Sequence, residues 1–306
     1  MEALRYGRCL TRACGLKVEI GIVTFGEGIM RPLALHQLTA LDASPLELVS
    51  LAAQTGCQRI VTWVHDPVDP FPGKGWKQFG FPSITPQTKK EMRVRLRDTG
   101  IELANIEMFP ITKGVDPTVY HPYLEMGADL GAERAVAHIH DLDENRAIDT
   151  FSKFCEIAAG YGLGVGVEFM GLIDACATLE RGLFFVKKID RPNVGVALDF
   201  LHVVHTGATV EDIKNIPGKY ISYAQICDGP NLTVTRDYLD EGLNRLVPGD
   251  GIWPVRAIIE AIPYGVAMDI EIPLKNDQER GATPLQRATR AAIAARRVVE
   301  TANPTR

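Results

Sequence analysis

Short apolar segments rich in β-branched residues recur along the chain at fairly regular intervals. Within each segment the apolar residues run on instead of alternating strictly with polar ones, which is typical of parallel strands covered on both faces. We predict eight strands from this pattern, at residues 18–24, 59–65, 101–107, 134–140, 164–169, 194–200, 220–226 and 266–271.

Helical patterns separate the predicted strands. Apolar residues recur about every 3.6 positions over residues 45–54, 86–99 and 145–161. Two of these stretches begin with Ser44-Pro45 and Thr85-Pro86, in which an N-cap residue precedes proline at the first helical position. Glycines follow several of the stretches, as expected where a helix ends and the chain enters the next strand.

Eight strands that alternate with helices in one uninterrupted chain predict an α/β protein with a single (β/α)8 TIM barrel. The alternative is an open, doubly wound sheet. We disfavour it because no GxGxxG motif follows the first predicted strand, where such a fold binds dinucleotides. We place the barrel at residues 16–306 and treat residues 1–15 as an irregular N-terminal extension.

Polar side chains mark the ends of the last four predicted strands, where such barrels carry their active sites. Each apolar run ends in a side chain with a ligating oxygen, namely Glu168, Asp199, Gln225 and Glu271. Buried carboxylates that converge repel one another unless a cation compensates them, and an oxygen-only set suits Mn²⁺ or Mg²⁺. Alternatively, each acid only caps a strand or the following helix; repetition over four consecutive strands favours the metal site.

Composition narrows the class of protein. The 306 residues include 33 Lys and Arg against 38 Asp and Glu, a formal charge of −5, which argues against a nucleic-acid binder. Six scattered cysteines without a CxxC pair indicate reduced thiols and a cytoplasmic location. We find neither the ~18 consecutive apolar residues of a membrane helix nor a signal-peptide pattern in residues 1–15, and expect no membrane partner.

The strand ends and one loop resemble the xylose isomerase-like TIM barrels. That superfamily includes sugar isomerases and epimerases, some acting on sugar phosphates, inosose and 3-dehydroshikimate dehydratases, and the type IV (family 2) AP endonucleases. The resemblance extends over roughly residues 16–300 and is strongest in the second half. The matching segments are VGVEF (165–169), VALDFLH (196–202), YAQICDG (223–229), PGDG (248–251) and MDIEIP (268–273).

The resemblance implies one divalent metal ion per chain, held by Glu168, Asp199, Gln225 and Glu271. Mn²⁺ and Mg²⁺ are the expected ions, with Co²⁺ and Zn²⁺ as alternatives. Epimerase-like members generally have a histidine where this chain has Gln225, whereas some dehydratase-type members have glutamine. An amide oxygen is a harder ligand than imidazole and weakens any preference for zinc.

The activity that the resemblance implies is isomerisation or epimerisation of a small polyhydroxylated carbonyl compound, a sugar or a cyclic polyol ketone, through a metal-stabilised enediolate. Glu168 and Glu271 would then exchange the proton. The alternative is a dehydratase in which a β-hydroxyl leaves, with His202 of the family's D-x-x-H pattern as proton donor or base. A zinc endonuclease conflicts with seven histidines and the acidic charge, and a non-catalytic barrel subunit conflicts with the intact ligand set.

Further residues are candidates for contacting the substrate, although each could serve only packing. His65, Glu107 and one of His138 and His140 end predicted strands. The loops 66–85 and 228–251 exceed the ~12–15 residues of simple connectors, so we expect binding loops or lids. The aromatic residues of the first, among them Trp76, would wall a ring-shaped substrate or form a homodimer contact. Arg245 in the second would bind a substrate carboxylate or phosphate, or remain solvated.

Overall fold

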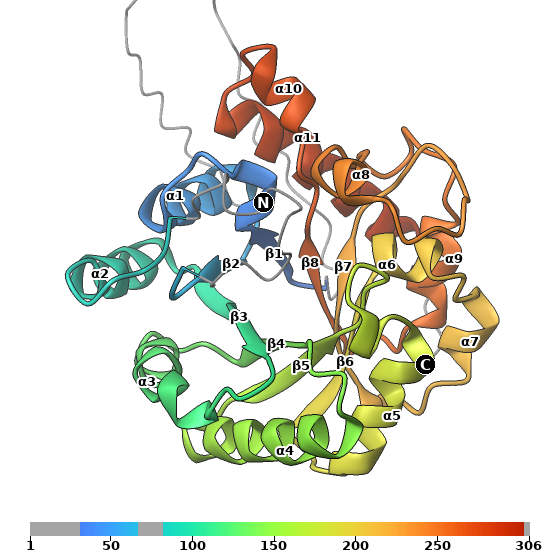
Figure 1. The fold of residues 1–306 in the computed structure, drawn as a ribbon. Helices are drawn as coiled ribbons and strands as arrows, with labels where there is room; N and C mark the ends of the chain where they lie inside the picture. Colours follow the sequence, from blue (N-terminus) through green and yellow to red (C-terminus); the bar gives the residue numbers. More distant parts are fainter. Residues whose placement is uncertain (1–30, 67–81, 303–306) are drawn as a thin grey trace, which may run out of the picture. The chain divides into compact units, whose positions relative to one another are not determined.

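The computed structural model describes residues 31–66 and 82–302. Eight parallel strands pair in chain order, and the last pairs with the first, so that the sheet closes into a barrel (Figure 1). The prediction of a (β/α)8 barrel is thereby confirmed. The strands are β1 (Leu33–His36), β2 (Arg59–Trp63), β3 (Glu102–Ile111), β4 (Arg134–Ile139), β5 (Gly164–Glu168), β6 (Val194–Asp199), β7 (Ile221–Ile226) and β8 (Ala267–Ile270).

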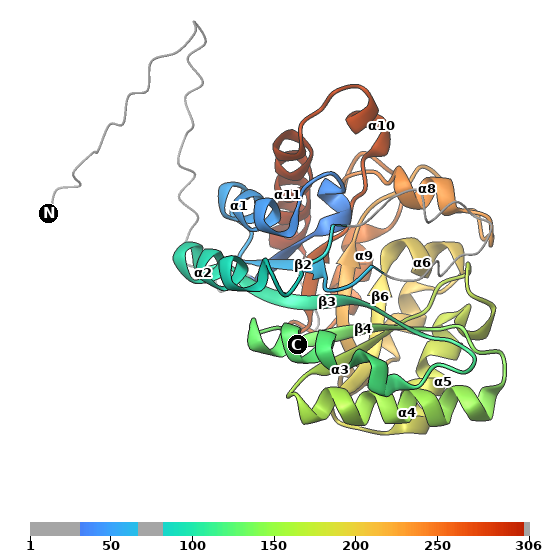
Figure 2. The same ribbon diagram turned by 60° about the vertical axis from the view of Figure 1, so that its left-hand side comes forward.

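Helices surround the strands, as Figures 1 and 2 show from two directions. Helix α1 packs against α2 on one side and α11 on the other, and α4 packs against α5. Among the described residues, no helix has both the length and the apolar character needed to cross a membrane. The helices are α1 (Pro45–Thr55), α2 (Lys89–Thr99), α3 (His121–Asp129), α4 (Glu144–Gly160), α5 (Leu179–Ile189), α6 (Phe200–His205), α7 (Val210–Lys214), α8 (Leu239–Leu243), α9 (Val255–Ala261), α10 (Lys275–Glu279) and α11 (Pro284–Thr301).

The first strand lies further along the chain than the sequence pattern predicts. Leu33–His36 pairs with both β2 and β8 and closes the barrel, so the prediction of 18–24 as the first barrel strand is wrong; those residues lie outside the described part of the chain. Strand β1 has only four residues, and the 3₁₀ helix Gln37–Ala40 follows at once. So short an apolar run gives a weak periodicity signal.

Local hydrogen bonds explain where the predicted helices begin. The Ser44 side chain accepts from the Glu47 amide, and the Glu47 carboxylate accepts from the Ser44 amide at 2.8 Å, a capping box that starts α1 as predicted. Helix α2 instead begins at Lys89, because Thr85 and Thr88 bind each other through backbone and hydroxyl groups and form a separate turn.

The interior of the barrel is filled below its mouth. Val136, Ala197 and Tyr223 form an apolar cluster there. The Tyr223 ring lies against Gly166, where an added Cβ would come within 2.3 Å of a ring carbon, so only glycine fits at this point of β5. Nearby, the Asn105 amide donates to Asp269 at 2.6 Å, and burial raises the pKa of Asp269 to about 7.

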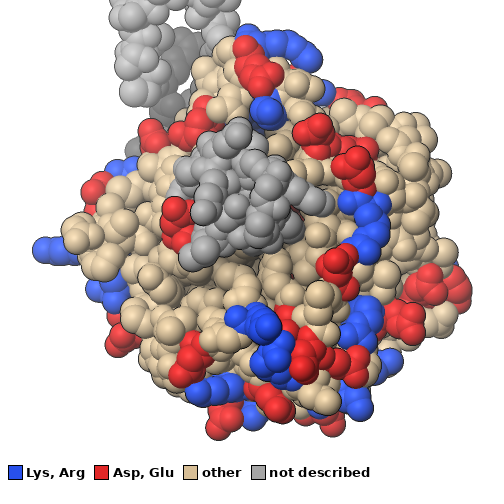
Figure 3. Space-filling view, in the orientation of Figure 1, with Lys and Arg blue, Asp and Glu red and all other residues tan. Residues whose placement is uncertain are grey.

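The outer surface mixes charges of both signs. On the face in Figure 3, Lys and Arg lie beside Asp and Glu around the rim. Arg290, for example, pairs with both Asp250 and Asp277 at 2.6 Å. Such exposed pairs contribute little to stability individually, and this mixed pattern accords with the small net charge of −5.

Candidate metal and active site

The four side chains expected to bind a metal meet at the C-terminal mouth of the barrel. Glu168 and Asp199 are the last residues of β5 and β6, Gln225 is the penultimate residue of β7, and Glu271 directly follows β8. The parallel register sets Asp199 beside Gln225 on neighbouring strands. All four side chains are buried, with exposures of 0–5%. Their convergence follows from the shared direction of parallel strands, whose carboxyl ends lie at one edge of the sheet.

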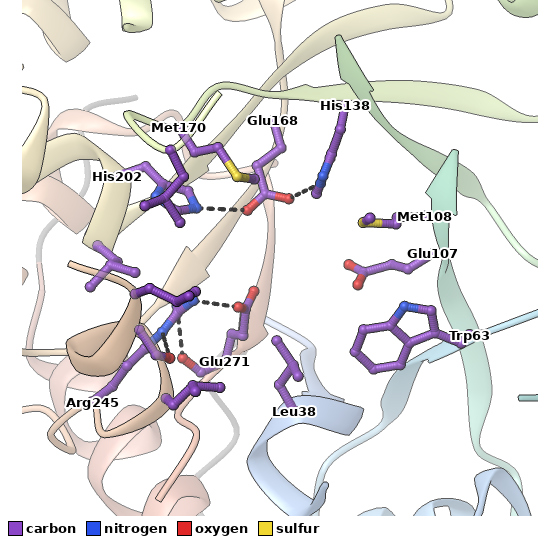
Figure 4. A pocket seen from close by; sticks show the side chains of 15 residues that line it. Leu38, Trp63, Glu107, Met108, His138, Glu168, Met170, His202, Arg245 and Glu271 are labelled. Carbon is purple, nitrogen blue, oxygen red and sulfur yellow. Dashed lines mark hydrogen bonds and ion pairs between the residues drawn. The ribbon is translucent and has the colours of Figure 1, made fainter. Parts of the chain in front are cut away.

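Glu168 accepts contacts from two histidines on neighbouring elements (Figure 4). His138 on β4 is bonded through Nε2 to Glu168 Oε2 at 2.8 Å, and Nε2 of His202 on α6 lies 3.3 Å from Oε1. Burial favours the protonated form of Glu168, but the hydrogen bonds and charges of the two histidines outweigh it and hold its pKa well below the usual range. Glu168 is therefore an ionised carboxylate, able to bind a cation or accept a proton.

Arg245 bridges the other two acids of the site. Its guanidinium donates to Asp199 Oδ2 at 2.8 Å and to Glu271 Oε1 at 2.5 Å, and the side chain is 4% exposed. Burial lowers the pKa of Arg245, but Asp199 and Glu271 raise it well above its usual range. The alternative that Arg245 remains solvated is wrong, because two carboxylates of the protein hold its buried guanidinium. Arg245 also lines the pocket, and its contact with a substrate anion stays a prediction.

Gln225 has the orientation expected of an oxygen ligand. Its amide nitrogen donates to Glu271 Oε2, while its amide oxygen is buried and has no hydrogen-bond partner among the described residues. A buried polar atom without a partner costs about 1–3 kcal/mol. A cation bound to the Gln225 oxygen would remove that cost.

The charges of the site also fit a bound cation. Arg245 directly opposes Asp199 and Glu271, whereas Glu168 faces the Nε2 atoms of His138 and His202. Burial raises the pKa of Glu271 to about 8, against the opposing charges of Arg245 and His36, and a nearby divalent cation would favour its ionised form. Ligating atoms of Glu168, Asp199 and His202 also lie within 4.8 Å of one another. His202 is therefore a further candidate ligand, through nitrogen, beside the four oxygen ligands.

The opposite wall of the pocket combines one polar pair with apolar side chains. His36, at the end of β1, bonds to Glu107 at 2.9 Å and lies 3.7 Å from Glu271. Trp63, the last residue of β2, stands beside Glu107 (Figure 4). The cavity between the walls has a volume of about 60 Å³. Its apolar lining consists of Leu38, Met108, Met170, Leu172, Leu201, Leu239 and Leu243.

The structure brings most, but not all, of the predicted substrate-contacting residues to this pocket. Glu107 and His138 line it. His65 does not, because β2 ends at Trp63 and the His65 ring packs against Phe109 and Tyr123, with ring centroids 5.3 and 4.7 Å apart. Trp76 lies outside the described residues.

Three residues of the site were missed in the sequence pattern. The predicted first strand ends at residue 24, so the pattern assigns His36 no role. The second predicted strand extends to His65, two positions beyond Trp63, so the pattern points to His65 and not to Trp63. Tyr238, which contacts His202, lies in the loop between β7 and α9, and only the three-dimensional path of that loop identifies it. For His36, the available signal in the sequence is its place at the end of the short apolar run LALH (33–36).

Asp228 organises the loop that carries PGDG. Its Oδ1 accepts from the amides of Gly229 and Trp253 at 2.8 and 3.0 Å. Its Oδ2 accepts from the amides of Gly249 and Gly251 at 2.9 and 3.2 Å. These four backbone amides occupy the hydrogen-bond acceptor positions of both carboxylate oxygens. Asp228 therefore holds the loop together and does not face the pocket.

These features define a (β/α)8 barrel with a buried acidic site at its C-terminal mouth. The chain belongs to the xylose isomerase-like TIM barrel family, whose model matches residues 49–296. The resemblance of the strand ends to this family is thus confirmed.

Individual relatives are more distant. The chain is 29% identical over 115 residues to an inosose isomerase from Bacillus subtilis (strain 168), which is 37% of this chain and 38% of that protein. It is 28% identical over 167 residues to a 3-dehydroshikimate dehydratase from Pseudomonas putida (strain KT2440), which is 54% of this chain and 26% of that protein. The matches therefore span less than half the length of these curated relatives.

Solved structures show the same fold. The IolI protein with a bound zinc atom is similar at a TM-score of 0.71 and 18% identity, over 90% of this chain and 100% of that one. An L-ribulose 3-epimerase is similar at a TM-score of 0.65 and 18% identity, over 89% of this chain and 95% of that one. At these identities the likeness demonstrates the fold alone.

Proposed function

We propose that the protein is a divalent-metal-dependent isomerase or epimerase acting on a small polyhydroxylated carbonyl compound. The observation that carries this proposal is the convergence of Glu168, Asp199, Gln225 and Glu271 from four consecutive strands, with a buried Gln225 oxygen that has no partner among the described residues. The relatives named as inosose isomerase and epimerase support the same chemistry.

The roles of the side chains follow from their positions. A divalent cation held by the four ligands would polarise a substrate carbonyl and a neighbouring hydroxyl. Glu168, ionised and oriented by His138 and His202, would remove the proton beside the carbonyl. Glu271, which lies across the cavity from Glu168 (Figure 4), would take up a proton from solvent and deliver it to carbon, while Glu168 releases the proton that it removed to solvent. The apolar wall would exclude water while the proton is in transit.

Deuterium incorporation tests the reaction. We expect that incubation in D₂O with Mn²⁺ and a panel of ketoses and inososes yields a rearranged product with deuterium at the carbon next to the carbonyl. Proton nuclear magnetic resonance (NMR) would detect it, because protons taken up from solvent are returned to carbon. A panel that shows neither rearrangement nor exchange would contradict the proposal.

A dehydratase is the second candidate, favoured by Gln225 in place of histidine, the apolar wall suited to a ring, and the similarity to 3-dehydroshikimate dehydratase. The same proton would be removed, but a β-hydroxyl would leave as water, with His202 protonating it. Including 3-dehydroshikimate in the panel separates the reactions: an ultraviolet absorbance rising from a new conjugated double bond, without exchange into any sugar, would establish the dehydratase.

Metal binding provides a test that needs no substrate. We expect one Mn²⁺ or Mg²⁺ per chain, removable with EDTA and restored on addition, measured by elemental analysis and titration. Glu271→Ala should abolish most of this affinity because it deletes a ligand. The matched control is Glu107→Gln, which neutralises a carboxylate of the same pocket outside the proposed ligand set and should still bind one ion. Full affinity in Glu271→Ala would overturn the assignment.

The identity of the ion depends on Gln225. Replacing Gln225 with histidine should shift the preference from Mn²⁺ toward Zn²⁺ or Co²⁺, because imidazole is a softer ligand than an amide oxygen. Gln225→Glu serves as the control, since it keeps an oxygen ligand and should keep the original ranking. Competition titrations of the three proteins measure the ranking, and an order unaffected by histidine would place Gln225 outside the coordination shell.

A further inference from the structure

Tyr238 joins three elements around His202. Its hydroxyl accepts a hydrogen bond from the Gly171 amide at 2.7 Å and lies 2.9 Å from His202 Nδ1. Gly171 follows β5 in the loop that leads to α5, His202 belongs to α6, and Tyr238 itself immediately precedes α8. The tyrosine side chain is buried, with an exposure of 3%. Its hydroxyl is therefore confined to these partners.

Counting donors and acceptors fixes where the tyrosine proton lies. The Gly171 amide can only donate, so it uses a lone pair of the phenol oxygen and leaves the phenol proton without an acceptor. His202 Nδ1 is the one acceptor within hydrogen-bond distance of Tyr238 among the described residues. Burial raises the pKa of Tyr238 above its usual range, so the phenol keeps its proton. Tyr238 consequently donates to His202 Nδ1.

This hydrogen bond selects one tautomer of His202. With Nδ1 accepting, the ring proton of neutral His202 lies on Nε2. Nε2 is 3.3 Å from Glu168 Oε1 and 3.7 Å from Asp199 Oδ2, so its N–H is directed at two carboxylates of the site. A protonated nitrogen has no lone pair for a metal ion.

We propose that Tyr238 is a positioning residue that keeps His202 a hydrogen-bond donor and excludes it from the metal coordination shell. The metal would then be held by Glu168, Asp199, Gln225 and Glu271. The alternative set that includes His202, whose ligating atoms are also close enough to hold an ion, would not form. This inference concerns the site of the proposed function, but it is a statement about a proton position and does not depend on the substrate.

The surroundings of Tyr238 hold its ring in place. His205 stacks on it with ring centroids 4.5 Å apart and an interplanar angle of 11°. His205 is itself held through Nδ1 by the Thr233 carbonyl at 2.8 Å and through Nε2 near Glu241 at 3.1 Å. The donor geometry at His202 is thus fixed by two packed helical elements and does not depend on one flexible side chain.

Long-range ¹H–¹⁵N NMR of the ¹⁵N-histidine-labelled full chain tests the proposal, with His202→Gln identifying the His202 signals. Spectra are taken at about pH 8, above the ordinary histidine pKa of about 6.5. We expect wild-type His202 to show the neutral Nε2–H tautomer, and to keep it when Zn²⁺ is added. In Tyr238→Phe, Nδ1 has lost its hydrogen-bond donor, so the Nδ1–H form should appear beside the Nε2–H form. Zn²⁺ should then bind Nε2 and remove the remaining Nε2–H signal.

The control is Tyr120→Phe, which deletes another buried hydroxyl, bonded to the Pro110 carbonyl at 2.6 Å. It should leave the His202 tautomer and its response to zinc unchanged. Any of three results would overturn the proposal: an Nδ1–H tautomer in the zinc-free wild type, loss of the wild-type Nε2–H signal on zinc addition, or an unaltered tautomer in Tyr238→Phe. If Tyr238→Phe does not fold, the wild-type spectra recorded with and without zinc still test the proposal. A protein that binds neither zinc nor Mn²⁺ would contradict the proposed function, and the zinc-free spectra would still decide this inference.

Discussion

Replacing Glu168 with glutamine should slow deuterium exchange at the substrate carbon by about 10²–10⁴-fold, the usual contribution of a positioned general base. Glutamine has nearly the same shape, and its single amide oxygen can accept from His138 or His202, but an amide cannot accept the substrate proton. The exchange rate in D₂O at saturating Mn²⁺ is the measurement, and the thermal midpoint of unfolding shows whether the barrel remains intact.

Glu168→Asp is the matched control for that experiment. It retains a carboxylate that can accept a proton, but withdraws it by one methylene, so its exchange rate should fall between those of the wild type and Glu168→Gln. Metal titration of both variants separates a loss of the ion from a loss of the base. Exchange in a metal-loaded Glu168→Gln protein within about tenfold of the wild-type rate would show that another group removes the proton.

Replacing Arg245 with methionine should produce the largest loss of stability among substitutions at the site. The Arg245 guanidinium lies between Asp199 and Glu271, and its removal deprives both buried carboxylates of their arginine partner. Breaking a buried ion pair in this way costs about 3–5 kcal/mol. Denaturant unfolding of the metal-free proteins measures the difference in the free energy of unfolding.

Metal ions should partly restore the Arg245→Met protein. A cation bound to the folded state raises its stability, and it would bind more tightly once the competing guanidinium charge is gone. We therefore expect a larger Mn²⁺-induced rise in the thermal midpoint for Arg245→Met than for the wild type. The control is Arg287→Met on α11, a buried arginine paired with Asp42 outside the pocket. It should lose stability without altering the Mn²⁺ effect; equal Mn²⁺ effects in all three proteins would argue against a metal beside Arg245.

The amino-acid pattern alone predicts seven of the eight barrel strands within a few residues and the four side chains proposed as ligands. Both follow from local signals: buried parallel strands are continuous apolar runs, and Glu168, Asp199 and Gln225 each end such a run. Because parallel strands end at one edge, residues distant in sequence can be grouped without knowing any contact between them. Glu271 is accessible to the same reasoning, whereas His202 is identified only through its resemblance to the family's D-x-x-H pattern.

Tertiary structure alone decided the remaining features. Strand β1 became recognisable only through its pairing with β2 and β8, since four residues carry too little periodicity. Arg245 and Tyr238 lie in an irregular loop, where no repeating pattern relates sequence position to direction. Their partners, Asp199, Glu271 and His202, stand on other elements. Strand periodicity predicts which face a side chain occupies, whereas the partner of a loop residue depends on how the chain closes over the barrel mouth, which is settled by long-range packing.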